Sequence, residues 1–211
     1  MTDTKLPLPV LMLVTDRSVA GGTDALVEKV AEAVTGGVNI VQLRDKDLAH
    51  EELMPLVKRL QDAIAGRALL VLNRPPVTVL EAHVDGVHLP EDAELPEGWP
   101  HRLLIGRSVH SVASARRAGT DGADYVALGP VFETQSHAGA PAMGTAPLRE
   151  VTESVAIPVI AIGGVTVDSV QEVCEAGAAG VAVIRAILGA SDPRAAAREL
   201  RDALDAVRSP A

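Results

Sequence analysis

The sequence predicts a single-domain (β/α)8, or TIM, barrel. Eight short apolar runs alternate with amphipathic segments from one end of the chain to the other. Strand–helix alternation requires right-handed crossovers and a parallel sheet, and eight such units close a barrel. An open doubly wound sheet is the alternative, but residues 14–22 lack the G-x-G-x-x-G expected after its first strand. No linker interrupts residues 1–211, so we expect one domain with a core from about 8 to 207.

The apolar runs are rich in Val, Leu and Ile, and each is about four or five residues long. Such near-continuous apolarity is typical of strands that are buried on both faces. The eight predicted strands are 10–14, 39–43, 68–72, 86–89, 103–106, 125–128, 158–162 and 180–184.

The segments between the runs repeat apolar residues every three or four positions, which is the period of an amphipathic helix. The predicted helices are 24–35, 51–64, 111–118, 167–176 and 195–207. A further helix is expected at 75–82, where two prolines suit a first turn, and residues 91–100 are predicted to be an irregular connection. Glycines at 36–37, 119 and 177 follow three of the helices, where a left-handed cap is expected.

Composition excludes several classes of protein. A formal net charge of −9 and only three aromatic residues argue against nucleic acid or an anionic membrane as a partner. The single Cys174 excludes an internal disulfide, and we expect it to be a small buried residue. No metalloprotease, zinc or Walker motif is present. Since neither a membrane-length apolar run nor a signal-peptide pattern is found, a cytoplasmic protein is expected.

Cationic side chains follow the second predicted strand. Gln42, Arg44 and Lys46 alternate along the chain, so in a strand they point to the same side. An amide and two cations on one side suit an anion. A solvated salt-bridge ladder with Asp45 and Asp47 is the structural alternative. Because a buried strand runs directly into the cluster, we favour an anion site.

A second anion site is predicted after the last two strands. Gly163 and Gly164 follow the seventh strand, and Ile184 and Arg185 end the eighth. Loops after strands 7 and 8 commonly hold phosphate in a barrel, with backbone N–H groups as donors. Glycines there would let the backbone approach a ligand closely.

Residues 129–144, after the sixth strand, form the longest Gly-, Pro- and Ser-rich connection. They carry Thr134, Ser136 and His137, so we expect a mobile lid, with a flexible connector that has no role as the alternative. Ser108 is expected to face the barrel mouth. His110 receives no role.

Two further residues near the strands are expected to be structural. Ser111 is predicted to cap the helix that follows it. His88 lies within a predicted strand, and we expect an interior histidine with a satisfied hydrogen bond.

Seven stretches, in order, together resemble the thiamine phosphate synthase/TenI superfamily, whose fold is a (β/α)8 barrel. They are 13–17 (LVTDR), 37–46 (GVNIVQLRDK), 85–89 (DGVHL), 105–111 (IGRSVHS), 124–134 (DYVALGPVFET), 158–164 (PVIAIGG) and 176–184 (AGAAGVAVI). A synthase of this superfamily joins hydroxymethylpyrimidine diphosphate to hydroxyethylthiazole phosphate and releases pyrophosphate. The resemblance places the two substrates on different residues. The pyrimidine diphosphate set is Gln42, Arg44, Lys46, Asn73 and Ser108, and the thiazole phosphate set is Thr134, Ser136, Gly163, Gly164, Ile184 and Arg185.

The chain departs from the synthase pattern where magnesium is expected. The pattern has an Asp after Asn73, and this chain has Arg74. A second Asp is expected at Ala93, beside Asp92, and a lysine at His137. We expect no cofactor and no metal, unless the chain is a synthase. Mg²⁺ would then bind with Asp92 as a ligand, and Arg74 would help to compensate for the missing carboxylate.

The TenI branch, whose activity is thiazole tautomerisation, does not need the magnesium pair. Residues 106–111 and 131–134 resemble this branch. Its proposed catalytic histidine falls at Pro130, so His137 becomes the candidate catalytic residue for proton transfer.

The sequence therefore predicts an enzyme of thiamine biosynthesis that binds a thiazole phosphate. TenI-like, thiazole tautomerase-type proton transfer is the leading hypothesis. Thiamine phosphate synthase is the alternative, and a non-catalytic regulator that binds a phosphate ligand is the second. A homodimer is compatible with the resemblance and with the Ala-rich helices.

Overall fold

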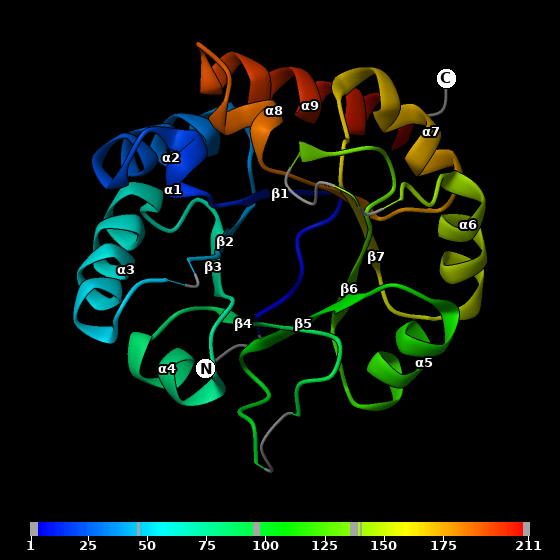
Figure 1. The fold of residues 1–211 in the computed structure, drawn as a ribbon, viewed down its shortest axis with the longest axis horizontal. Coiled ribbons are helices and arrows are strands. Elements are labelled where there is room, and N and C mark those ends of the chain that lie inside the picture. Colours follow the sequence, from blue (N-terminus) through cyan, green and yellow to red (C-terminus); the bar gives the residue numbers. More distant parts are fainter. Residues whose placement is uncertain (1–3, 46, 95–97, 136–138, 140, 209–211) are drawn as a thin grey trace.

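Eight parallel strands close into a barrel in the computed structural model, which describes residues 4–45, 47–94, 98–135, 139 and 141–208. Each strand pairs with the next along the chain, and β8 pairs with β1 (Figure 1). The strands are β1 Val10–Val14, β2 Ile40–Leu43, β3 Leu69–Leu72, β4 Gly86–Leu89, β5 Leu104–Val109, β6 Tyr125–Leu128, β7 Val159–Ile162 and β8 Gly180–Val183. The predicted barrel and its eight strands are confirmed. Only β5 differs much, because it continues to Val109 and so includes Ser108.

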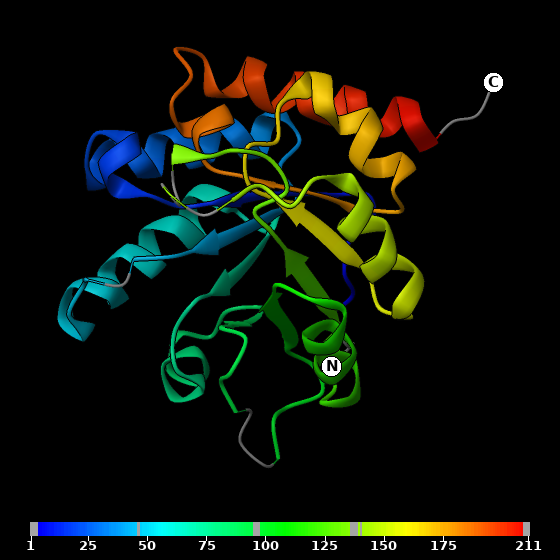
Figure 2. The same ribbon diagram turned by 45° about the vertical axis from the view of Figure 1, so that its right-hand side comes forward.

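Helices surround the barrel on the outside (Figures 1 and 2). The predicted helices are present as α2 Thr23–Gly36, α3 His50–Ile64, α4 Pro76–Ala82, α5 Val112–Thr120, α7 Val170–Glu175, preceded by the 3-10 turn η2 Val167–Ser169, and α9 Pro193–Arg208. Three further helices were not predicted. They are α1 Arg17–Ala20, α6 Thr145–Ser154 and α8 Arg185–Leu188. Two of these are four-residue turns, too short to show a helical period.

Glycine caps are confirmed at two of the three predicted helix ends. Gly37 caps α2 with φ 117°, and Gly177 follows α7 with φ 93°. The prediction at Gly119 is wrong, because Gly119 lies inside α5 and the left-handed residue is Gly122, with φ 86°. Ser111 caps the start of α5 as predicted, since its hydroxyl accepts the Ser114 amide at 3.1 Å.

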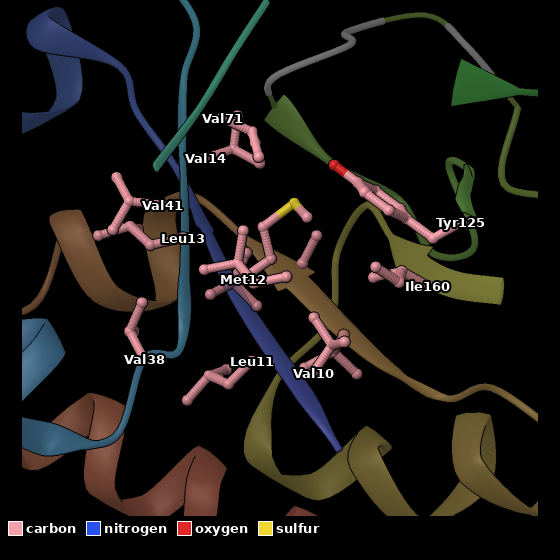
Figure 3. Close-up of a cluster of buried hydrophobic side chains, with 14 of the residues drawn as sticks. Val10, Leu11, Met12, Leu13, Val14, Val38, Val41, Val71, Tyr125 and Ile160 are labelled. Carbon is pink, nitrogen blue, oxygen red and sulfur yellow. The ribbon is translucent and has the colours of Figure 1, made fainter. Parts of the chain in front are cut away.

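The core fills both the barrel and the space between barrel and helices. Along β1, side chains alternate between the interior, where Val10 and Met12 lie near Tyr125 and Ile160, and the helix layer (Figure 3). Tyr125 is fully buried.

Cys174 is half-buried, not fully buried as predicted. No helix within the described ranges is long and apolar enough to cross a membrane.

Polar side chains tie the strands together at the amino-terminal end of the barrel. Asn39, Asp85 and Asp124 each precede an even-numbered strand. Each accepts a backbone amide of the strand before it, at 2.9, 2.8 and 2.7 Å. These bonds satisfy N–H groups that the strand ladder leaves open at its start. The opposite, carboxyl-terminal ends remain open for ligand-binding loops.

Candidate active site

Two adjoining cavities lie at the carboxyl-terminal ends of the strands. The first, which we call the β7–β8 cavity, has a volume of about 390 Å³ and is lined by residues 133–135, 162–166 and 182–186. The second, the β2–β5 cavity, has a volume of about 250 Å³ and includes Gln42, Asn73, His88 and Ser108 in its lining. The two cavities share a wall, which consists of Ile162, Gly163 and Ile184. The active face of the barrel therefore offers two neighbouring binding spaces.

The β2–β5 cavity brings together four of the five residues predicted for the pyrimidine diphosphate. Gln42, Arg44, Asn73 and Ser108 all line it, and Lys46 lies outside the described residues. Gln42 is buried at the end of β2, and Arg44 follows where the chain leaves the strand. The residues thus converge from three different strand ends.

Arg44 is not part of a salt-bridge ladder with its neighbours. Asp45 and Asp47 instead pair with Arg17, at 2.6 and 2.8 Å. Burial raises the pKa of Asp45, although the Arg17 hydrogen bond opposes that shift. The Arg44 amide donates to Thr15 Oγ1 at 2.9 Å, which fixes the backbone at this point. Arg17 binds both carboxylates, and Arg44 lines the cavity.

His88 is the interior histidine that the sequence predicted, but it also reaches the cavity lining. Its Nδ1 lies 3.2 Å from the Tyr125 hydroxyl, and its Nε2 lies 3.0 Å from Ser108 Oγ. Burial, with a smaller contribution from the charge of Arg44, lowers the His88 pKa to about 4. The ring is therefore neutral near pH 7.

Glu91 and His110 line the β2–β5 cavity, whereas the sequence analysis did not single out Glu91 and gave His110 no role. Glu91 Oε2 lies 2.6 Å from His110 Nδ1. The Arg107 guanidinium donates to the carbonyl oxygens of Glu91 and Ala93, at 3.0 and 2.6 Å, and so holds this segment in place. The position of each residue just beyond a strand end was the available signal. Glu91 was passed over because residues 91–100 were predicted to be an irregular connection.

Arg74 and Asp92 both make contacts outside the β2–β5 cavity. The Arg74 guanidinium donates to the carbonyl oxygens of Asp45 and Leu48, so it fastens the loop after β2. The Asp92 carboxylate is 91% exposed and pairs with Arg117 at 3.1 Å. Neither side chain lines the β2–β5 cavity. Their role in compensating for missing magnesium ligands stays a prediction.

Among the described residues that line it, the β2–β5 cavity offers one carboxylate, Glu91, to a magnesium ion, and Mg²⁺ is commonly held by one or two carboxylates together with substrate phosphates. Within the described part of the chain, no three His, Cys, Asp or Glu side chains gather as a metal-binding group. Glu91 is paired with His110. Arg44 supplies positive charge to this cavity.

The β7–β8 cavity brings together the residues predicted for the thiazole phosphate. Thr134, Gly163, Gly164, Ile184 and Arg185 all line it. Ser136 and the candidate catalytic His137 lie outside the described residues, as does the middle of the predicted lid.

Two glycines in the lining of the β7–β8 cavity are required by the packing of the protein itself. Gly163 and Gly164 have φ values of 98° and 66°. A Cβ on Gly164 would lie 2.4 Å from the Glu133 carbonyl oxygen, and one on Gly163 would lie 2.7 Å from Pro130 Cα. The backbone of the connection after β6 thus occupies the close approach that the sequence suggested for a ligand. The glycines shape the wall between the cavities.

Comparisons with known proteins identify the family of the chain. The family model described as thiamine monophosphate synthase (TMP-TENI) matches residues 11–187. A thiamine-phosphate synthase of Methanoculleus marisnigri is 42% identical over 207 residues, covering 94% of this chain and 97% of the relative. One of Anaeromyxobacter dehalogenans is 40% identical over 197 residues, covering 90% and 88%. The solved structure of a thiamine phosphate pyrophosphorylase from Pyrococcus furiosus is similar, with a TM-score of 0.84 and 36% identity over 95% of this chain and 97% of that one.

Proposed function

The chain belongs to the thiamine monophosphate synthase/TenI family, and we propose that it is a thiamine phosphate synthase. It is an enzyme of thiamine biosynthesis. As a synthase it would join hydroxymethylpyrimidine diphosphate to hydroxyethylthiazole phosphate and release pyrophosphate. This replaces tautomerisation as the leading hypothesis, because relatives about 40% identical carry the synthase name.

The observation that carries the proposal is the pair of adjoining cavities. A reaction that joins two phosphorylated substrates needs two binding spaces that meet, whereas a tautomerase needs one. Four of the residues predicted for the pyrimidine diphosphate line the β2–β5 cavity, and five of those predicted for the thiazole phosphate line the β7–β8 cavity. The two cavities meet at Ile162, Gly163 and Ile184. Reacting groups bound on either side of this wall would be close to each other, which is the positioning that such a transfer requires.

Loss of pyrophosphate leaves a cation on the pyrimidine and puts negative charge on the leaving group. Arg44 is placed to bind the diphosphate, since its guanidinium offers several donors in a planar fork. Backbone N–H groups near Gly163 and Gly164, with Arg185, would hold the thiazole phosphate. No step is assigned to His137.

The direct test mixes the two substrates with the purified protein and measures pyrophosphate release and thiamine phosphate formation. We expect turnover that needs both substrates. If the protein instead isomerises the thiazole carboxylate phosphate tautomer and forms no thiamine phosphate, it is a tautomerase. Binding by calorimetry without any turnover would identify a non-catalytic binder. Parallel assays with added Mg²⁺ and with a chelator measure the metal requirement.

A reciprocal pair of variants tests the assignment of the cavities. Arg44→Ala should weaken binding of the pyrimidine diphosphate about 10- to 100-fold, since a charge-assisted hydrogen bond is worth about 1.5–3 kcal/mol. It should leave binding of the thiazole phosphate nearly unchanged. Arg185→Ala should do the reverse. Calorimetry with each substrate measures both constants, and equal losses for the two substrates would show that the cavities are assigned wrongly.

A further inference from the structure

Three polar side chains form a chain of hydrogen bonds that runs from the barrel interior to the β2–β5 cavity. The Tyr125 hydroxyl contacts Nδ1 of His88 at 3.2 Å, and Nε2 of His88 contacts Ser108 Oγ at 3.0 Å. Tyr125 and His88 are 0% and 2% exposed, whereas Ser108 is half-buried and lines the cavity. Ser108 is therefore the end of the chain that a ligand can touch.

The strand register explains why these side chains meet. His88 on β4 pairs with Gly106 on β5, and Gly106 pairs with Tyr125 on β6. A Cβ on Gly106 would lie 2.3 Å from the Tyr125 hydroxyl oxygen, so the glycine gives the ring room to reach across β5. Figure 3 shows the Tyr125 ring with Met12 and Ile160 in the interior cluster. Ser108 lies two residues beyond Gly106 on the same face of β5.

The buried hydroxyl of Tyr125 sets the direction of the chain. Within the described residues, its hydrogen-bond partner is Nδ1 of His88. A buried donor without an acceptor costs about 1–3 kcal/mol, so the phenol donates its proton to Nδ1. A neutral imidazole whose Nδ1 accepts carries its own proton on Nε2. His88 therefore donates to Ser108 Oγ.

We propose that Tyr125 and His88 are positioning residues that fix Ser108 as a hydrogen-bond donor to the ligand in the β2–β5 cavity. Because His88 donates to the Ser108 oxygen, the Ser108 proton cannot point at His88 and points into the cavity instead. The cavity then selects a ligand with an acceptor at this point, such as a ring nitrogen or a phosphoryl oxygen. It disfavours a ligand with a donor there.

The role in substrate selection rests on the proposed function, whereas the direction of the chain does not. Nitrogen-15 NMR of the ligand-free wild-type protein, with labelled histidine, tests the direction alone. We expect His88, assigned by its absence from His88→Gln spectra, to show a protonated Nε2 and an unprotonated Nδ1. Protonation at Nδ1 would overturn the proposal whatever the enzyme catalyses.

Steady-state kinetics of Tyr125→Phe test the consequence for the substrate. The variant removes the phenol proton, so His88 can adopt the other tautomer and Ser108 loses its fixed direction. We expect the KM for the pyrimidine diphosphate to rise about 3- to 10-fold, which corresponds to one neutral hydrogen bond. The KM for the thiazole phosphate should stay constant. A parallel rise in both KM values would indicate general distortion and count against the positioning role.

His88→Gln and His88→Ala form a matched pair that does not depend on Tyr125. The glutamine amide can still donate to Ser108, whereas alanine cannot. We expect the Gln variant to retain more of the affinity for the pyrimidine diphosphate than the Ala variant, as measured by calorimetry. Thermal unfolding of both variants provides the check on folding. If both variants fold and bind the pyrimidine diphosphate with equal affinity, the proposal is contradicted. This result does not depend on whether the protein makes thiamine phosphate.

Discussion

At the scale of single residues, the β2–β5 cavity places a neutral imidazole close to a permanent cation. Arg44 lines the same cavity as His88, and its charge adds to burial in disfavouring the protonated ring. The neutral form is also the form that the Tyr125 and Ser108 contacts require. Burial, local charge and hydrogen bonding therefore favour the same protonation state.

The depressed pKa of His88 predicts a pH-dependent stability. The unfolded chain takes up a proton near pH 6.5, whereas the folded protein does so only near pH 4. Between these values the unfolded state binds more protons, so stability is fully present above pH 6.5 and falls as the pH is lowered toward 4. The difference corresponds to about 3 kcal/mol. Urea unfolding of wild type and His88→Gln from pH 7.5 to 4.5 should show a steeper loss in the wild type, and parallel curves would contradict the prediction.

Residue patterns in the sequence are local, so they predicted which residues follow a strand but not which charged side chains pair. Alternation after a strand identified Gln42 and Arg44, which do line one cavity. It could not show that Arg17 binds Asp45, because that contact joins residues 28 positions apart. Nor could it show that Arg74 turns to the loop after β2. Pairing among charged side chains depends on tertiary contacts that no periodicity reports.

At the scale of elements, the strands were predictable and the short helices were not. A strand buried on both faces needs only an apolar run, and all eight runs became strands of the barrel. A helix of one turn, such as α8, has no period to detect. For α6 the cause is different, because it follows a Gly- and Pro-rich connection and buries only Leu148 and Val151. Helices such as α6 and α8, which depend mainly on packing against neighbouring elements, show no clear pattern in the sequence.

The connection between β1 and β2 depends on Asn39. Its Oδ1 accepts the amide of Leu11 at 2.9 Å, and its Nδ2 donates to the Pro9 carbonyl at 2.8 Å. Asn39→Ala should lower the free energy of unfolding by about 1–3 kcal/mol, because the amide of the fully buried Leu11 loses its acceptor.

Asn39→Asp is the matched control, since it keeps an acceptor for Leu11 but replaces the donation to Pro9 with a carboxylate oxygen, which is repelled by the Pro9 carbonyl. The Pro9 carbonyl would still accept from Arg201 at 3.0 Å. Chemical denaturation should therefore rank wild type above Asp and Asp above Ala. Equal stability of Ala and wild type would show that the Asn39 contacts contribute nothing.

At the scale of the whole molecule, the site exists because the barrel closes. Strand ends that are distant in sequence, such as Arg44 after β2 and Ser108 on β5, face one cavity only when all eight strands form the ring. The topology told us that the strand ends would converge. It could not tell us that the connection after β6 would pack on Gly163 and Gly164.

Closure also depends on the fit of the last helix against the first long one. α9 packs on α2, and Arg201 of α9 donates to the Gly37 carbonyl at 3.2 Å. A Cβ on Gly36 would lie 2.4 Å from the Arg194 carbonyl oxygen and 2.7 Å from the Ala197 Cβ. Since the obstacle is partly backbone, the two helices would have to move apart to admit a methyl group.

Gly36→Ala should therefore destabilise the protein by about 1–3 kcal/mol, the usual cost of overpacking. Gly119→Ala is the matched control in a second helix, because the added Cβ would lie 3.8 Å from Ile157 Cδ1, an ordinary van der Waals distance. Alanine is the better helix former, so this control should be neutral or stabilising by up to about 1 kcal/mol. Thermal and urea unfolding of the two variants measure the difference. If Gly36→Ala proved as stable as Gly119→Ala, the close contact of α2 with α9 would not be what holds the first and last parts of the barrel together.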